Sequence, residues 1–325
     1  VQSQGTGFAA NYNPMVISTD TRTWNDLNRD DIAQENEIGP TSNLNFGIRS
    51  NQNPSPDISR PYQWVYDLAV QHEVAQGVSL SVSYNRRDFK EIIWTQNLLA
   101  PISVYTLTSV PDPLVAGQTI PVYNLNPSAL GRVDLLDDNS PNNRMYYQGV
   151  DVTAAVRWRG ASLNGGTSTG RTISVTCDVQ DPNNLLYCDQ TEYHVPFRTL
   201  FRVSGTYELP WGIRASGVFQ SVPGGARQLT YLVDRAVLPT LTQPSVTVRL
   251  NQPNTLFLDT VNQLDVSFSK TVRASGLEVR PELSIFNALN ANPVTGQTNA
   301  YGPNLNRVTA ILPGRLIRIG LTLRY

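Results

Sequence analysis

Charged side chains are scarce in this sequence. Asp, Glu, Lys and Arg make up 16% of its 325 residues, whereas roughly 25% is usual in soluble domains. Long hydrophobic runs are also missing, since nothing approaches the roughly 18 apolar residues of a membrane-spanning helix. We therefore exclude a helical membrane protein. A β-barrel stays possible at the mean hydropathy of −0.26, because barrel strands alternate apolar with polar residues.

A bias toward one sign of charge is absent as well. The formal net charge is −1, so bulk charge gives no reason to expect a nucleic-acid partner. The sequence starts at Val1 without an initiator Met, a basic leader or an apolar leader. From this start we expect either a processed mature protein or a fragment of a longer one.

Only two cysteines occur, Cys177 and Cys188, separated by a loop rich in Asn, Asp and Pro. A disulfide across this loop would imply an oxidising compartment. Two alternatives stay open, a metal site that would use His194 and a pair of unlinked thiols. We predict the disulfide, because closing such a loop restricts the unfolded chain and stabilises the folded one.

An alternation of apolar and polar residues begins sharply at Pro61 and recurs along the chain. Period-two alternation is typical of a strand with one apolar and one polar face. The segments are about 10–13 residues long, which matches tilted membrane strands better than average soluble strands. They comprise about nine strands, at 61–74, 78–89, 146–158, 161–170, 197–209, 213–222, 262–272, 277–287 and 316–325.

The connections between these segments alternate in length. Turns of about two or three residues alternate with long connections near 90–145, 171–196, 223–261 and 288–314. Transmembrane barrels have this layout, with short periplasmic turns and long extracellular loops. We therefore predict an all-β fold, an antiparallel transmembrane β-barrel segment over 61–325. The layout also predicts that residues 1–60 and the Cys177–Cys188 loop lie outside the cell.

Aromatic residues lie near the predicted strand ends, as an interfacial girdle requires. They are Tyr62, Trp64, Trp158, Trp211 and Tyr325. In the alternative fold, a soluble β-sandwich or propeller, aromatics would lie more often in the middle of strands. The polar residues that alternate with the apolar ones would point to the opposite side of the sheet and line the lumen. There they would contact a plug or a ligand, or form ion pairs with one another. Its charged members are Asp67, Glu73, Arg157, Arg198, Arg202, Glu208 and Arg214.

Five stretches carry a family resemblance that covers nearly the whole chain. They are DLNRDDIAQENEIGP at 26–40, PYQWVYDLAVQHEV at 61–74, NQLDVSFSK at 262–270, LSIFNALNANPV at 283–294 and the terminal strand that ends in Tyr325. The sequence resembles the C-terminal third of TonB-dependent receptors. It is most similar to the Oar-like group, which carries an N-terminal carboxypeptidase-regulatory-like domain, and to Acidobacteria-type members.

The resemblance implies a plugged barrel of about 22 strands in the bacterial outer membrane. Such a receptor takes up scarce nutrients with energy from the inner-membrane TonB complex. About nine strands cannot close this barrel, so we expect this chain to be its last part. The plug domain, the remaining barrel strands, outer-membrane lipid, the TonB complex and an unknown ligand are then its expected partners.

One acidic segment has the spacing of a calcium-binding loop. Oxygen ligands recur at positions 1, 3, 5, 9 and 12 of this pattern, and position 7 offers a backbone carbonyl. The matching residues are Asp26, Asn28, Asp30, Ile32, Gln34 and Glu37. Asp31 departs from the pattern, since Gly normally permits the sharp turn at position 6. We predict a structural calcium ion, and the alternative is a solvated acidic loop.

Enzyme chemistry finds little support in the sequence. Residues 166–170 spell G-x-S-x-G, but a nucleophile elbow needs a helix after the serine, and none is expected there. His72 and His194 are the only histidines, and neither is flanked like a catalytic base. We predict a non-enzymatic outer-membrane receptor or transporter segment that takes up a ligand. The alternatives are a structural or adhesive outer-membrane barrel and, less favoured, a secreted β-rich hydrolase.

Overall fold

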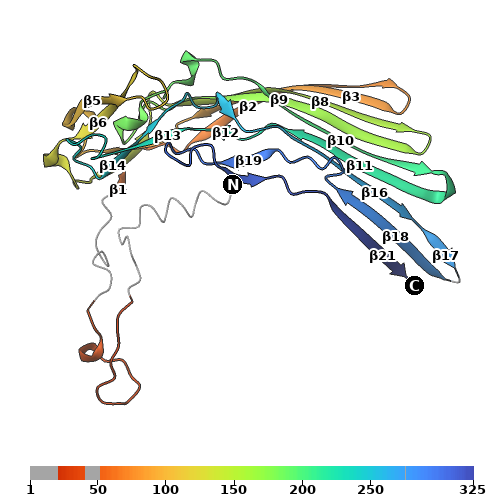
Figure 1. Cartoon of the computed structure of the whole chain (residues 1–325), viewed down its shortest axis with the longest axis horizontal. Helices are drawn as coiled ribbons and strands as arrows, with labels where there is room; N and C mark the ends of the chain where they lie inside the picture. Colours follow the sequence, from red (N-terminus) through yellow and green to blue (C-terminus); the bar gives the residue numbers. More distant parts are fainter. Residues whose placement is uncertain (1–20, 41–51, 275) are drawn as a thin grey trace.

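The computed structural model describes residues 21–40, 52–274 and 276–325, and they form an all-β protein. Nine long strands build one antiparallel sheet, which confirms the predicted fold class (Figure 1). They are β2 (Tyr62–Ala75), β3 (Val78–Lys90), β8 (Arg144–Trp158), β9 (Ala161–Val175), β10 (Arg198–Leu209), β11 (Ile213–Val222), β16 (Val261–Lys270), β18 (Leu277–Phe286) and β21 (Leu316–Arg324). Within the described residues, no helix has the length and apolar character to cross a membrane.

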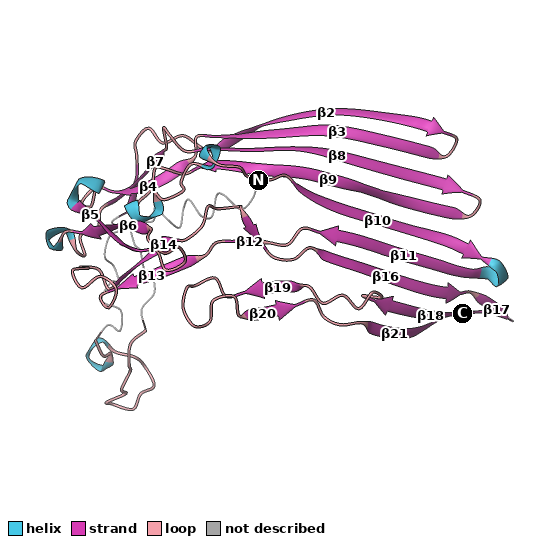
Figure 2. Cartoon of the chain, turned by 45° about the horizontal axis from the view of Figure 1, so that its top comes forward, coloured by secondary structure: helices cyan, strands magenta, loops and turns pink. Residues whose placement is uncertain are grey.

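The long strands follow one another across the sheet in sequence order. The short strand β17 (Val272–Ala274) pairs with β18, and β21 lies on the other side of β18. Figure 2 shows the short turns at one end of the sheet and the long connections at the other. Among the described residues, no strand pairs with the outer edge of β2 or of β21. The sheet is therefore an open, curved wall.

The strand register places the alternating apolar residues of all nine strands on the same side of the sheet. Side chains of directly paired residues point to the same side of a sheet, and successive residues alternate sides. Paired residues carry one face through the sheet: Leu68–Tyr84, Val82–Val152, Val152–Thr167, Thr167–Phe201, Val203–Phe219, Phe219–Leu264, Phe268–Leu283 and Leu283–Ile319. We call this side the apolar face and the opposite side the polar face. Leu68 is 71% exposed and Ile319 is 83% exposed, so the apolar face is open.

Tight turns hold this register at one end of the sheet. Arg159 and Gly160 join β8 to β9 with φ of 41° and 82°, the left-handed pair that suits the twist of a two-residue hairpin. Trp211 and Gly212 in η6 (Pro210–Gly212) also have positive φ, 66° and 70°. These turns lie where the sequence predicts them. Residues 1–20 and 41–51 of the predicted extracellular segment 1–60, and Ser275 of the last turn, lie outside the described residues.

The long connections contain short strands of their own, which the alternation pattern does not predict. We call residues 52–61, 91–143, 176–197, 223–260 and 287–315 the loop layer. Its strands are β1 (Gln52–Pro54), β4 (Ile93–Asn97), β5 (Tyr105–Pro111), β6 (Thr119–Leu125), β7 (Leu135–Asn139), β12 (Ala226–Arg227), β13 (Thr230–Asp234), β14 (Ser245–Arg249), β15 (Leu256–Phe257), β19 (Val294–Gln297) and β20 (Val308–Ile311). Its 3₁₀ turns are η2 (Ile102–Val104), η3 (Pro127–Ala129), η4 (Pro182–Asn184) and η5 (Gln190–Glu192), and a further turn, η1 (Glu35–Glu37), lies nearer the N-terminus.

A hydrophobic core lies in the loop layer. The hairpins β5–β6 and β13–β14 pack together, and Leu186 of the 176–197 loop lies against them. Burying one such aliphatic side chain stabilises a fold by roughly 1.5–3 kcal/mol, which offsets the entropy lost by ordering these connections. The buried members are Val110, Ile120, Val122, Val233, Leu241, Val246 and Val248.

Two buried polar side chains join the long connections to one another. Asn183 donates to the Tyr123 carbonyl over 2.9 Å, and its own oxygen accepts from the Tyr123 N–H at 2.8 Å. Arg227 is 8% exposed and donates to the side-chain oxygens of Asn299 (3.0 Å) and Asn306 (2.7 Å). The hydrophobic core joins these two pairs of connections, so all four form one layer.

Candidate functional site

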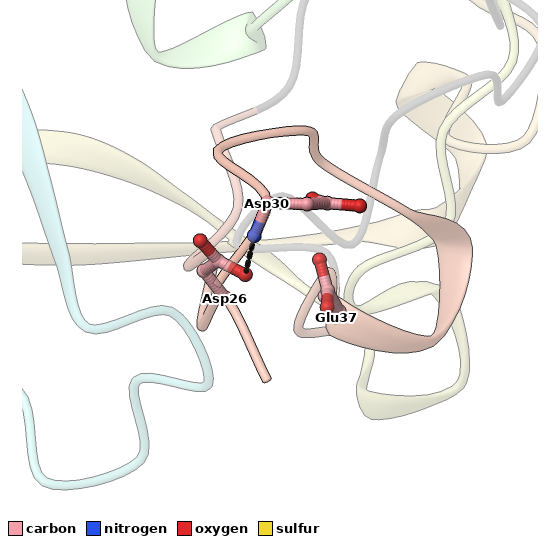
Figure 3. A group of neighbouring side chains, drawn as sticks. All are labelled: Asp26, Asp30 and Glu37. Atoms are coloured by element: carbon pink, nitrogen blue, oxygen red, sulfur yellow. Dashed lines mark hydrogen bonds between the residues drawn. The ribbon is translucent and has the colours of Figure 1, made fainter. Parts of the chain in front are cut away.

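The acidic loop brings three carboxylates together. One oxygen each from Asp26, Asp30 and Glu37 lies within 4.8 Å of the others (Figure 3). Glu37 is only 4% exposed and accepts from the Leu27 N–H at 3.0 Å and from Trp24 Nε1 at 3.2 Å. A backbone bridge between Trp24 and Ile38 holds the two ends of the loop side by side. The predicted first, fifth and twelfth positions therefore face one another.

The loop backbone makes the sharp turn at Asp31, the position where calcium loops usually have Gly. Asp31 has φ of 56° and Arg29 has φ of 63°, both in the left-handed region that Asp tolerates better than most residues. Asp31 thus adopts the positive φ for which calcium loops use Gly. The Asp26 carboxylate accepts from the N–H groups of Arg29 at 2.6 Å and Asp31 at 3.0 Å, and so holds this turn in place.

The remaining predicted ligands lie beside the carboxylates without joining them. The amide groups of Asn28 and Gln34 donate to Asp30 Oδ2 at 2.9 and 2.7 Å, so their NH₂ groups face the Asp30 carboxylate. The Ile32 N–H donates to Asp30 Oδ1 at 2.9 Å. Clustered carboxylates repel one another unless a cation neutralises them. The loop supplies hard oxygen donors of the kind that Ca²⁺ prefers.

The predicted disulfide between Cys177 and Cys188 is present. Beside it, Asp178 accepts from the Asn142 backbone N–H at 3.1 Å and the Asn142 side chain at 3.0 Å. The Ser140 hydroxyl also donates to Asp178, at 2.5 Å. Burial alone would raise the pKa of Asp178, but these hydrogen bonds outweigh burial and lower the pKa. The ionised Asp178 carboxylate therefore links the disulfide loop to the segment just before β8 by hydrogen bonds.

The 176–197 loop also lines a pocket. A hollow of about 330 Å³ separates the disulfide from the segment around β4, with Trp94, Ile102 and Leu185 among its apolar lining residues. Further along this loop, burial raises the pKa of the Tyr193 hydroxyl to about 12. Tyr193 is therefore neutral at physiological pH and meets the Tyr187 ring edge-on at 6.5 Å.

The predicted lumen-facing charges all lie on the polar face. Register places Arg202 beside Gly166, and Glu208 beside Arg214, which form an ion pair at 2.6 Å. Short side chains on β3, β8 and β9 leave an open groove of about 840 Å³ on this face, lined in part by Ser81, Thr153 and Ser168. The G-x-S-x-G segment at 166–170 lies in the middle of β9, paired on both sides. A nucleophile elbow is therefore excluded there.

Comparisons with known proteins give fold-level likenesses only. No protein-family model matches the sequence, and no curated protein matches it. Among solved structures, the outer membrane transporter YddB from Escherichia coli aligns with 84% of this chain and 34% of its own, at 13% identity and a TM-score of 0.44. The FrpB iron transporter from Neisseria meningitidis aligns with 83% of this chain and 32% of its own, at 13% identity and a TM-score of 0.42.

The ferripyoverdine receptor of Pseudomonas aeruginosa, solved with ferripyoverdine bound, is also similar. It aligns with 81% of this chain and 27% of its own, at 8% identity and a TM-score of 0.42. This chain thus spans about a third of the length of the first two transporters and less of the receptor.

Loss of the Asp178 carboxylate should loosen the disulfide loop. Its pKa is lowered from 3.8 in the folded state, so its stabilising contribution is present above that value and lost as pH falls through the lower folded value. We expect Asp178→Asn to speed hydrogen exchange of the 140–143 and 176–180 amides at pH 7. The wild type should show the same increase only below about pH 4. Asp181→Asn, elsewhere in this loop, is the control, and equal exchange in all three proteins would contradict the assignment.

Proposed function

We propose that this chain forms part of the wall of an outer-membrane β-barrel that acts as a receptor or transporter. The observation that carries the proposal is the apolar face, which the register continues from strand to strand over nine long strands. Exposed apolar surfaces of such extent are rare on soluble proteins and mark membrane or protein contacts. Short turns at one end and long loops at the other support the periplasmic and extracellular assignment.

The open sheet edges support the expectation of further barrel strands. A long unpaired edge is a template for another strand, and a barrel removes edges by closing. The resemblance to TonB-dependent receptors suggests the remaining partners, namely a plug domain and the TonB complex. In this proposal residues 61–325 form the incomplete barrel and residues 1–60 lie outside the cell. The loop layer, held by its own core and disulfide, presents the surface for a ligand that is still undefined.

A structural or adhesive barrel without active transport is the alternative, and the polar face distinguishes the two. In a plugged receptor the groove near Ser81 contacts protein, whereas in an open barrel it contacts water. We expect a photo-crosslinking residue at Ser81 of the full-length protein, in its native membrane, to form a cross-link within the polypeptide, to the plug. The same residue at Val82, on the apolar face, should label lipid.

Mass spectrometry of the labelled peptides provides the measurement. A Ser81 position that gives no protein adduct, while Val82 still labels lipid, would favour the open structural barrel. Lipid labelling at both positions, or at neither, would contradict the placement of the two faces. Membrane fractionation of the same cells checks that the protein is in the outer membrane.

We further propose that the acidic loop of residues 26–37 binds one calcium ion, with Glu37 as bidentate ligand. The convergence of Asp26, Asp30 and Glu37 and the positive φ of Asp31 support this proposal. Asn28 and Gln34 would turn their amide oxygens toward the ion, and Ile32 would offer its carbonyl. The ion would fix the loop's shape and take no part in chemistry.

Substitution of the calcium ligands should weaken binding selectively. We expect Asp30→Asn and Glu37→Gln to reduce Ca²⁺ affinity roughly tenfold or more, the scale on which changes around a metal alter affinity. Glu35→Gln, an exposed neighbour outside the ligand pattern, should bind as the wild type does. Calorimetric titration with CaCl₂ measures this, and a wild-type protein that takes up no calcium would refute the site.

A further inference from the structure

The few charged residues on the apolar face are distributed unevenly. Register across the nine long strands, all of which lie within the described residues, assigns each strand residue to a face. At the loop end of the sheet, three adjacent strands carry Arg86, Asp88 and Lys90 on β3, Arg144 on β8 and Arg171 on β9. At the turn end, Lys270 of β16 pairs with Ile213 and is the one charged strand residue on this face among the described residues. The turn residue Arg159 lies nearby, with its guanidinium 5.3 Å from the centre of the Trp158 ring. We call Arg86, Lys90, Arg144 and Arg171 the basic belt.

Aromatic rings and one carboxylate hold two members of the basic belt in place. The Arg86 guanidinium lies 4.7 Å from the centre of the Tyr146 ring and forms an ion pair with Asp88 at 2.9 Å. Arg171 lies 4.5 Å from the Phe197 ring and donates to the Val195 carbonyl at 2.9 Å. Both cations are therefore positioned and restrained on the apolar face.

The other two members of the basic belt are exposed. Lys90 and Arg144 project at the strand ends, beside a pocket of about 560 Å³ that Arg86, Tyr146 and Ile173 also line. Asp88 and Glu91 are the carboxylates on the wall of this pocket. Asp189 of the 176–197 loop attracts Arg144 electrostatically. Arg86, Lys90 and Arg144 outnumber these two carboxylates on the pocket wall, which leaves an excess of positive charge there.

The belt lies directly beyond the apolar residues of the same strands. On β3, Val78, Leu80 and Val82 precede Tyr84, and the charges begin two residues further. In a membrane barrel the apolar band ends in an aromatic girdle at the interface, and headgroups lie beyond it. Arginine and lysine at this depth meet phosphate oxygens of lipid headgroups, for which guanidinium is a strong partner.

We propose that the basic belt binds the phosphate groups of a phosphorylated glycolipid in the outer leaflet. Lys90 and Arg144 contact the phosphates, while the acyl chains lie along Val82 and Val150 of the apolar face. The asymmetry of charge between the two ends of the sheet selects the outer leaflet. The inference rests on the proposed membrane placement, because the belt reaches headgroups only if the loop layer faces outward.

Lipid binding by purified full-length protein in detergent tests this inference. The probe is diphosphorylated lipid A, with its chemically dephosphorylated form as the comparison, and native mass spectrometry counts the bound lipid. We expect the double substitution Lys90→Gln/Arg144→Gln to lower lipid A affinity roughly tenfold, which equals about 1.4 kcal/mol. Lys270→Gln, which removes a strand cation from the other end of the apolar face, should leave affinity unchanged.

Two results would overturn the inference. One is equal binding of the phosphorylated and dephosphorylated lipids by the wild type. The other is equal loss of affinity in the Lys270→Gln control. Fractionation of the same variants separates this inference from the proposed function. If the protein is in the outer membrane but shows no preference for lipid A, lipid binding by the basic belt alone is refuted. If the protein is absent from the outer membrane, the membrane placement on which the inference depends is refuted.

Discussion

The strand register across the sheet is the constraint on which the rest of the structure depends. Because side chains alternate with a period of two, a slip of one residue would transfer a whole strand's apolar set to the other face. The tight turns at Arg159–Gly160 and Trp211–Gly212 fix the pairing at one end. The continuous apolar face, the polar groove and the basic belt all follow from that register.

The loop layer shows how long connections become ordered without regular strands of the sheet. Its hairpins bury a small aliphatic core, and buried amides such as Asn183 satisfy backbone groups between loops. The Cys177–Cys188 disulfide further restricts the unfolded chain. A surface preorganised in this way loses little conformational entropy when it binds a ligand. Such rigidity fits the receptor role that we propose for the loop layer.

The sequence predicts the long strands well, because alternation is a local property. It predicts β9 only to Gly170, and the structure extends this strand to Val175. The hairpins β5–β6 and β13–β14 are missed, since their short strands gain stability from contacts between separate loops. Composition and spacing predict the convergence of Asp26, Asp30 and Glu37, but the positive φ of Asp31 is a dihedral that no spacing reveals. The basic belt likewise requires the register of three strands.

Contact between the apolar face and lipid is the proposal on which the membrane placement depends. Nitroxide spin labels placed singly along β8 from Val150 to Val156 test it most directly, in the full-length protein reconstituted in lipid vesicles. We expect collision with apolar oxygen to peak at Val150, Val152, Ala154 and Val156. Collision with a water-soluble nickel complex should peak at Asp151, Thr153 and Ala155. Uniform accessibility along the strand, or the opposite alternation, would contradict the claim.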